Sequence, residues 1–120
     1  MSQSLCVSLT RSYDDPERAT MGFMVANAAL AAGSAVMVFL SIEGVRLALA
    51  GEAERTRLEG MPALGELVES FVKGGGQLIA CGTCFNRRGL KETALRPGAA
   101  IAGAATLTQY LAGGAPCVSL

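Results

Sequence analysis

The sequence contains no histidine among its 120 residues. Imidazole is therefore excluded as a general base or a metal ligand, and acid–base or nucleophilic chemistry falls to Cys, Asp, Glu, Tyr or Lys. The sequence also lacks an excess of either charge, since ten Lys and Arg residues balance ten Asp and Glu residues. No overall electrostatic field then attracts the chain to nucleic acid or to an anionic membrane, so we expect neither as a partner.

The start of the sequence lacks the basic segment and the cleavage site of a secretory signal. We therefore expect a cytoplasmic protein whose four cysteines remain free thiols. Residues 19–42 form an uncharged run of 24 residues, which is long enough to cross a bilayer of about 30 Å. Because Asn27 and the pair Gly33-Ser34 interrupt this run, it predicts an Ala-rich helix followed by a strand and no membrane span.

Apolar runs alternate with helical patterns along the whole chain. Strands are predicted at 5–10, 35–41, 77–81, 99–103 and 116–120, and helices at 16–32, 45–50, 63–73, 83–89 and 104–112. The charged segment 51–60 predicts a solvent-exposed, mobile loop. This order predicts a single α/β domain over residues 1–120, a three-layer α/β/α sandwich with a five-stranded, mainly parallel sheet.

In such a sheet, ligands bind beyond the carboxyl ends of the strands. Four segments are predicted there: 11–15, 41–44, 81–84 and 103–105. Cys81 is the strongest nucleophile in any of them, and it ends a strand just ahead of a helix. Arg87 and Arg88 follow, and residues 73–96 hold five positive charges against Glu92, a net charge of +4 (5 − 1). This pattern predicts an accessible Cys81 that is more acidic than a free cysteine.

From the residues alone, an inert Cys81 is equally well supported. In that interpretation Cys81 is a small buried apolar side chain, and the arginines only solvate a helix. Cys84 completes a Cys-x-x-Cys pair, which suits a redox motif or half of a zinc site. We expect no metal and no cofactor, because the other two cysteines, Cys6 and Cys117, stand singly on predicted strands, where they should pack. The Trp-Cys-Gly-Pro context of thioredoxin is also missing.

Several charged residues are weaker candidates. Asp15 precedes Pro16, so it is better explained as a helix cap than as a metal ligand paired with Asp14. Glu43 follows the second strand, where it is expected to orient a ligand or to pair with Arg11. A plain surface ion pair is an equally supported alternative. The candidate binding residues are Arg11, Glu43, Thr83, Arg87 and Arg88.

Several segments together resemble one family. Residues 78–81 (LIAC), followed by 82–84 (GTC) and 88–90 (RGL), resemble the cysteine segment of DsrE/DsrF-like (DsrEFH) sulfur-relay proteins. Residues 15–19 (DPERA), 28–33 (AALAAG), 36–39 (VMVF) and 43–45 (EGV) resemble the first helix, second strand and glycine loop of the same family. The resemblance implies a sulfurtransferase-like carrier in which Cys81 receives persulfide sulfur from a donor protein and passes it to an acceptor.

The resemblance also implies an oligomer, and we expect a homo-oligomer, either a trimer or a hexamer. Cys84 is present in only some family members, so the resemblance assigns it a less definite role than Cys81. The alternative function is that of a non-catalytic oligomeric protein with the same fold, which binds a ligand or serves as a scaffold. In that case Cys81 is incidental.

Overall fold

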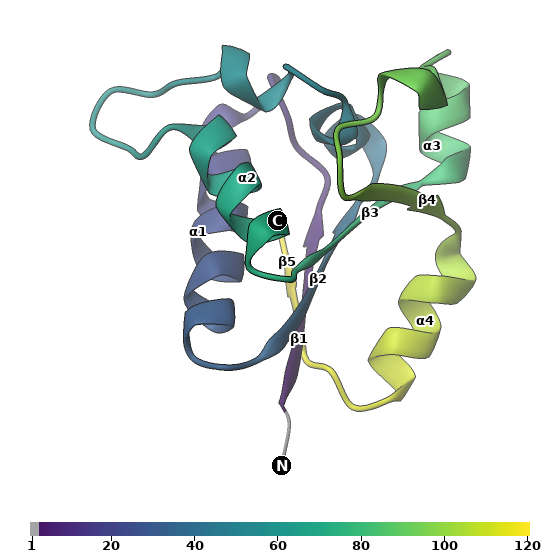
Figure 1. Cartoon of the computed structure of the whole chain (residues 1–120). Helices are drawn as coiled ribbons and strands as arrows, with labels where there is room; N and C mark the ends of the chain where they lie inside the picture. The colour runs from purple at the N-terminus through teal and green to yellow at the C-terminus, as the bar shows by residue number, and fades with distance from the viewer. Residues whose placement is uncertain (1–2) are drawn as a thin grey trace.

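A five-stranded parallel sheet forms the centre of the computed structural model, which describes residues 3–120 (Figure 1). The strands are β1 (Ser4–Leu9), β2 (Ala35–Leu40), β3 (Gln77–Cys81), β4 (Ala99–Ala102) and β5 (Cys117–Ser119). Their order in the sheet is β4-β3-β2-β1-β5, and every neighbouring pair is parallel. The predicted α/β fold is thus confirmed, with a sheet that is wholly parallel.

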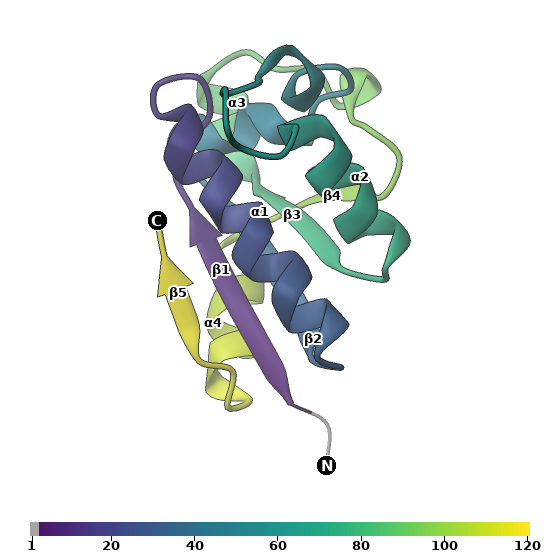
Figure 2. The same cartoon turned by 90° about the vertical axis from the view of Figure 1, so that its left-hand side faces the viewer.

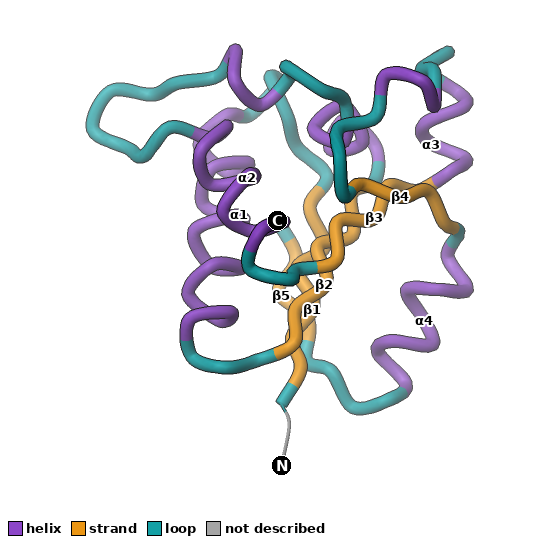
Figure 3. The backbone as a smooth tube through the Cα atoms, viewed as in Figure 1, coloured by secondary structure: helices purple, strands orange, loops and turns teal. Residues whose placement is uncertain are grey.

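Helices cover both faces of this sheet. On one face lie α1 (Pro16–Ala31) and α2 (Leu64–Lys73), while α4 (Ala104–Ala112) lies on the other (Figures 1 and 3). The short helix α3 (Gly82–Arg87) follows β3 at the carboxyl end of the sheet. The remaining helices are the 3₁₀ helices η1 (Ile42–Ala48), η2 (Ala53–Arg55) and η3 (Glu92–Ala94).

The two faces of the sheet are covered to different extents. On the α1 and α2 side, alternate strand residues such as Val7, Val38 and Leu78 are fully buried. They lie under Phe23 and Phe71, whose rings meet edge to face with centroids 5.8 Å apart. The α4 side has a smaller buried cluster, consisting of Cys6, Met37 and Phe39. No residue of α4 is itself fully buried, so this side is thinly covered.

Local signals place α1 where the sequence predicts it. The Asp15 carboxylate accepts a hydrogen bond from the backbone N–H of Arg18 at 3.1 Å, and Pro16 occupies the first turn. Asp15 is therefore a helix cap, as expected. Just after the helix, Gly33 has a φ of +94°, a conformation that glycine adopts without steric strain.

The charged segment 51–60 is mostly exposed, as predicted, but part of it is anchored to the rest of the fold. Within it, Ala53 is fully buried in η2, and Glu54 accepts two hydrogen bonds from Arg96 at 3.3 and 2.9 Å. The Arg96 side chain is only 9% exposed. A local charge pattern did not reveal this ion pair, because its two members are 42 residues apart.

The uncharged run 19–42 contains most of α1, a turn and β2, as predicted. Across residues 3–120, no helix has both the length and the apolar character needed to cross a bilayer.

Candidate functional site

Cys81 lies at the carboxyl edge of the sheet, where the sequence predicts it. It is the last residue of β3 and pairs with Ala102 of β4, so it stands on an inner strand. Cys81 is also the residue that precedes the first turn of α3. Its side chain is half-buried and contacts the hydrophobic clusters on both sides of the sheet. The predicted accessibility is therefore partial.

Cys84 lies in the first turn of α3, three residues after Cys81. Residues three apart on a helix are neighbours on its surface. Cys84 is half-buried and packs against the larger core cluster, and both cysteines are free thiols. Thr83, between the two cysteines, is exposed. Phe85, which follows Cys84, is fully buried and anchors the helix.

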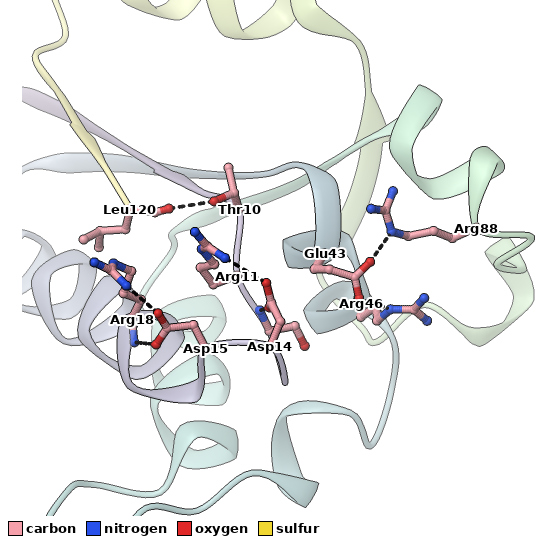
Figure 4. Close-up of polar contacts among 10 residues, drawn as sticks. Thr10, Arg11, Asp14, Asp15, Arg18, Glu43, Arg46, Arg88 and Leu120 are labelled. Carbon is pink, nitrogen blue, oxygen red and sulfur yellow. Dashed lines mark hydrogen bonds and ion pairs between the residues drawn. The ribbon is translucent and has the colours of Figure 1, made fainter.

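Glu43 is the centre of an ion-pair network beside this loop (Figure 4). One carboxylate oxygen accepts a hydrogen bond from Arg46 Nε at 2.8 Å, and the other accepts one from Arg88 Nε at 2.6 Å. The hydrogen bonds from Arg88 and then Arg46 hold the pKa of Glu43 below its usual value. Glu43 is therefore an anion that joins η1 to the end of α3.

Arg88 also holds the cysteine loop from within. Its Nη1 donates a hydrogen bond to the backbone carbonyl of Cys84 at 3.2 Å. The Arg88 side chain is 11% exposed. With these bonds to Glu43 and Cys84, the guanidinium fixes the orientation of α3, a positioning role that the sequence did not distinguish from ligand binding.

Three of the five positive side chains counted around Cys81 are paired with carboxylates. Lys73 pairs with Glu69 at 2.8 Å, Arg96 with Glu54, and Arg88 with Glu43. In the part of the chain that the structure describes, Arg87 is exposed and belongs to no ion pair. The helix α3 is short, as the sequence predicts, with six residues against a predicted range of 83–89.

Arg11 is not the partner of Glu43. It donates a hydrogen bond to Asp14 at 3.1 Å within the loop between β1 and α1 (Figure 4). The other Asp14 oxygen accepts a hydrogen bond from the backbone N–H of Ser12 at 2.9 Å. Arg11 is thus paired with Asp14 inside this turn, and its predicted pair with Glu43 does not form.

Sequence reasoning missed Ser41 as a neighbour of Cys81. The last pair of the ladder between β2 and β3 is Leu40 with Ala80, so Ser41 is the residue opposite Cys81. The backbone at Ser41 is still extended, with φ −137° and ψ 167°. Because strand side chains alternate, Ser41 follows Phe39 on the α4 side of the sheet, which is also the side of Cys81 and Ile79. The sequence allowed this inference, because in the predicted strand 35–41 side chains point alternately to the two sides of the sheet, and Ser41 is two residues after Phe39.

The residue after Ser41 has an unusual backbone. Ile42 has a φ of +56° and its side chain is 50% exposed. A β-branched residue in this left-handed region is strained, and such strain is concentrated at functional sites. Ile42 therefore adds an apolar, exposed side chain to the edge that holds Cys81.

Metal chemistry finds little support at this edge. Among residues 3–120, no group of three or more Cys, Asp or Glu side chains is arranged to hold an ion. The chemistry available here is that of a half-buried thiol with a second thiol nearby, a hydroxyl on the neighbouring strand, and a guanidinium that fixes the loop.

Comparison with known proteins gives a consistent family relationship. A sequence profile described as the DsrE/DsrF-like family matches residues 3–117. The chain is 35% identical over 102 residues to the uncharacterized protein MJ0760 of Methanocaldococcus jannaschii. That match covers 85% of this chain but 37% of the relative, so the chain corresponds to little more than a third of that protein.

Two solved structures share the fold. The crystal structure of the ychN protein from E. coli has a TM-score of 0.83 at 18% identity, covering 100% of both chains. Protein MTH1491 of unknown function from Methanobacterium thermoautotrophicum has a TM-score of 0.81 at 13% identity, covering 99% of this chain and 100% of that chain. At these identities the similarity shows the fold alone.

The network around Arg88 predicts a loss of stability when it is broken. Arg88→Ala should lower the free energy of unfolding by about 1–3 kcal/mol, because hydrogen bonds to charged groups contribute about that much and Glu43 loses its more buried partner. Urea unfolding measures the change.

The neighbouring variant Arg87→Ala is the control, and it should change stability by less than about 0.5 kcal/mol because Arg87 is exposed. The pKa of Glu43 is lowered in the folded state, so its ion pair contributes fully above the unfolded value near 4.5 and is lost as the pH falls through the folded value. The effect of Arg88→Ala should therefore shrink below about pH 4.5. Equal effects of the two variants at neutral pH would contradict this role for Arg88.

Proposed function

The chain belongs to the DsrE/DsrF-like family, and from this membership we propose that it is a sulfur-relay protein that carries a persulfide on Cys81. The observation that supports the proposal most is the position of Cys81. A free, half-buried thiol ends an inner strand of a parallel sheet, at the edge where such sheets bind ligands.

The proposed reaction is an exchange between two sulfur atoms. The Cys81 thiolate attacks the outer sulfur of a persulfide on a donor protein, a new S–S bond forms on Cys81, and the donor S–S bond breaks. The donor leaves as a thiolate, so no net oxidation occurs. A nucleophile on an acceptor protein then takes the outer sulfur by the same exchange and restores the Cys81 thiolate.

Residues around Cys81 have distinct parts in this proposal. Arg88 and Glu43 hold the loop in place, whereas Arg87 is exposed and available to attract the negative charge of an incoming persulfide. Ser41 directly follows β2, and continuing the register of β2 and β3 by one residue places it opposite Cys81 and on the same side of the sheet. A hydroxyl in that position suits donation of a hydrogen bond to the outer sulfur, which extends about 2 Å beyond the thiol.

Cys84 modulates the carrier in this proposal. Its thiolate attacks the inner sulfur of the Cys81 persulfide, hydrosulfide leaves, and a Cys81–Cys84 disulfide forms. A cellular thiol reductant then restores both thiols. The spacing of the two residues in the first turn of α3 supports such an exchange.

The two cysteines should differ when each is replaced by serine. We expect Cys81→Ser to abolish sulfur loading after incubation with a persulfide donor, because it removes the nucleophile. Cys84→Ser should load normally and hold the persulfide longer, since the competing thiol is gone. Intact-protein mass spectrometry, with peptide mapping of the added sulfur, measures both outcomes.

Cys117→Ser is a suitable control, since it removes an exposed thiol on β5 while leaving the Cys81 loop intact. Loading that survives Cys81→Ser and disappears in Cys84→Ser would reverse the assignment. Wild-type protein that takes up no sulfur at all would favour the scaffold alternative.

Ser41 should affect the persulfide without affecting the fold. Ser41→Ala is expected to shorten the lifetime of the Cys81 persulfide about fivefold, because one hydrogen bond contributes about 1 kcal/mol. The decay of the sulfur adduct, followed by mass spectrometry in the Cys84→Ser background, gives this lifetime. Ser8→Ala is the matched control, because Ser8 lies on the same side of the sheet but on β1, opposite Phe39. Equal lifetimes in the two variants would exclude a role for the Ser41 hydroxyl.

We also propose that the protein is a homo-oligomer. The α4 side of the sheet is thinly covered, and Ala100 of the edge strand β4 is exposed. Small apolar residues at an uncovered edge suit burial against another copy of the chain. This supports an interface at β4 and the neighbouring part of α4, and the family resemblance favours a trimer or hexamer.

Light scattering at micromolar concentration should give a mass of three or six chains. Ala100→Lys should shift the mass toward the monomer, because it places a charge in the proposed interface. Ala28→Lys is the control, because it places the same charge on the exposed side of α1, outside the proposed interface, and should leave the mass unchanged. A wild-type monomer would contradict the proposed assembly.

A further inference from the structure

Two cysteines outside the Cys81 loop lie directly side by side. Cys6 of β1 and Cys117 of β5 are paired residues in the parallel ladder between these strands (Figure 2 shows the two strands). The ladder is anchored at this point, because the backbone N–H of Cys6 donates a hydrogen bond to the carbonyl of Pro116 at 2.9 Å. Paired residues of neighbouring strands point to the same side of the sheet, here the α4 side on which Cys6 packs.

The spacing of these two residues suits a disulfide. Neighbouring strands lie about 4.8 Å apart, and disulfides join residues whose Cα atoms are about 4.4–6.8 Å apart. Both residues are free thiols. A bond between them therefore needs rotation of side chains and little movement of the strands.

The two thiols differ in their surroundings. Cys6 is fully buried, whereas Cys117 is exposed on an edge strand of three residues. Burial, together with the neighbouring Cys117, raises the pKa of the Cys6 thiol to about 12. Cys117 is thus the thiol that meets a reagent from solvent, whereas Cys6 is shielded from it.

We propose that Cys6 and Cys117 are a second dithiol, separate from the Cys81 loop, which closes to a disulfide when a peroxide oxidises Cys117. The burial of one thiol and the exposure of its paired neighbour define the order of events. Cys117 reacts first, and Cys6 resolves the product.

The chemistry balances in two steps. The Cys117 thiolate attacks one peroxide oxygen, the O–O bond breaks, and Cys117 becomes a sulfenic acid while the other oxygen leaves as water after protonation. Cys6 sulfur then attacks Cys117 sulfur, the S–O bond breaks, and the proton from Cys6 leaves with the hydroxyl group as a second water. The two thiols together lose two electrons, which the peroxide takes up.

Closure would fix β5 to the sheet. The strand β5 is joined to β1 by three residues, Cys117, Val118 and Ser119, and the following Leu120 binds Ser8 and Thr10 through backbone hydrogen bonds of 2.8 and 3.3 Å. A covalent bond at Cys117 would hold β5 in place independently of these hydrogen bonds. It would also close a loop that spans nearly the whole chain.

The test uses the full chain with Cys81→Ser and Cys84→Ser, so that the Cys81 loop cannot contribute. Stoichiometric hydrogen peroxide should lower the mass of the single chain by about 2 Da, with Cys6 and Cys117 in one cross-linked peptide under non-reducing conditions. Adding Cys6→Ser should stop the reaction at a sulfenic acid on Cys117, which dimedone traps. Adding Cys117→Ser should leave Cys6 unmodified at the same peroxide concentration.

Thermal unfolding supplies a second measurement on the same sample. The oxidised protein should melt at least about 5 °C higher than the reduced protein, because the bond constrains the unfolded chain, and a reductant should reverse the shift. Sulfinic acid on Cys117 without a cross-link, or dimers joined through Cys117, would overturn the proposal.

Discussion

The in-register parallel ladder that joins β1, β2 and β3 determines where the chemistry of this protein lies. Leu9 pairs with Leu40, and Leu40 pairs with Ala80, so the three strands reach the same edge of the sheet together. The loops that follow them therefore start side by side. One close approach keeps them there: Gly44 binds the Thr10 carbonyl, and a Cβ at Gly44 would lie 2.3 Å from the Leu9 carbonyl oxygen. Only glycine allows this packing.

Glu43 and Arg88 build on that arrangement. The position of Gly44 places Glu43 beside α3, and the ion pair with Arg88 then connects the loop after β2 to the helix after β3. Arg88 also reaches back to the Cys84 carbonyl, so through Arg88 the cysteine loop depends on Glu43, which follows a different strand. The thiol of Cys81 is thus positioned by the backbone of β3 and by the side chains of Glu43 and Arg88.

The sequence predicted the backbone of this site better than its electrostatics. The patterns at 77–81 and 104–112 were sufficient to predict β3 and α4 with the observed bounds, because each is a short apolar or helical run between glycines. The partners of Glu43 were not predictable in the same way. Arg88 is 45 residues away, and Arg11 was equally plausible until the turn with Asp14 was known.

The same limit applies to the charge around Cys81. A count along residues 73–96 treats all five positive side chains as neighbours of the thiol, but Lys73 is paired with Glu69 of its own helix, and Arg88 and Arg96 are paired with acids from distant segments. Ser41 shows the opposite case. Its relation to Cys81 follows from strand register, which needs the pairing of β2 with β3 and no side-chain contact at all. Sequence periodicity gives the side of the sheet, while register gives the neighbour.

The isoleucine at position 42 lowers the stability of the fold and at the same time adds an exposed apolar side chain to its surface. A residue with a side chain costs about 1–2 kcal/mol in the left-handed conformation, and glycine would avoid most of that cost. The chain has an isoleucine there, with half of its side chain in water. The folded state therefore carries a local penalty that its core must offset. In return, the turn presents a rigid apolar group whose direction is set by the backbone before any partner arrives, so a partner that contacts it loses little conformational entropy in ordering that loop.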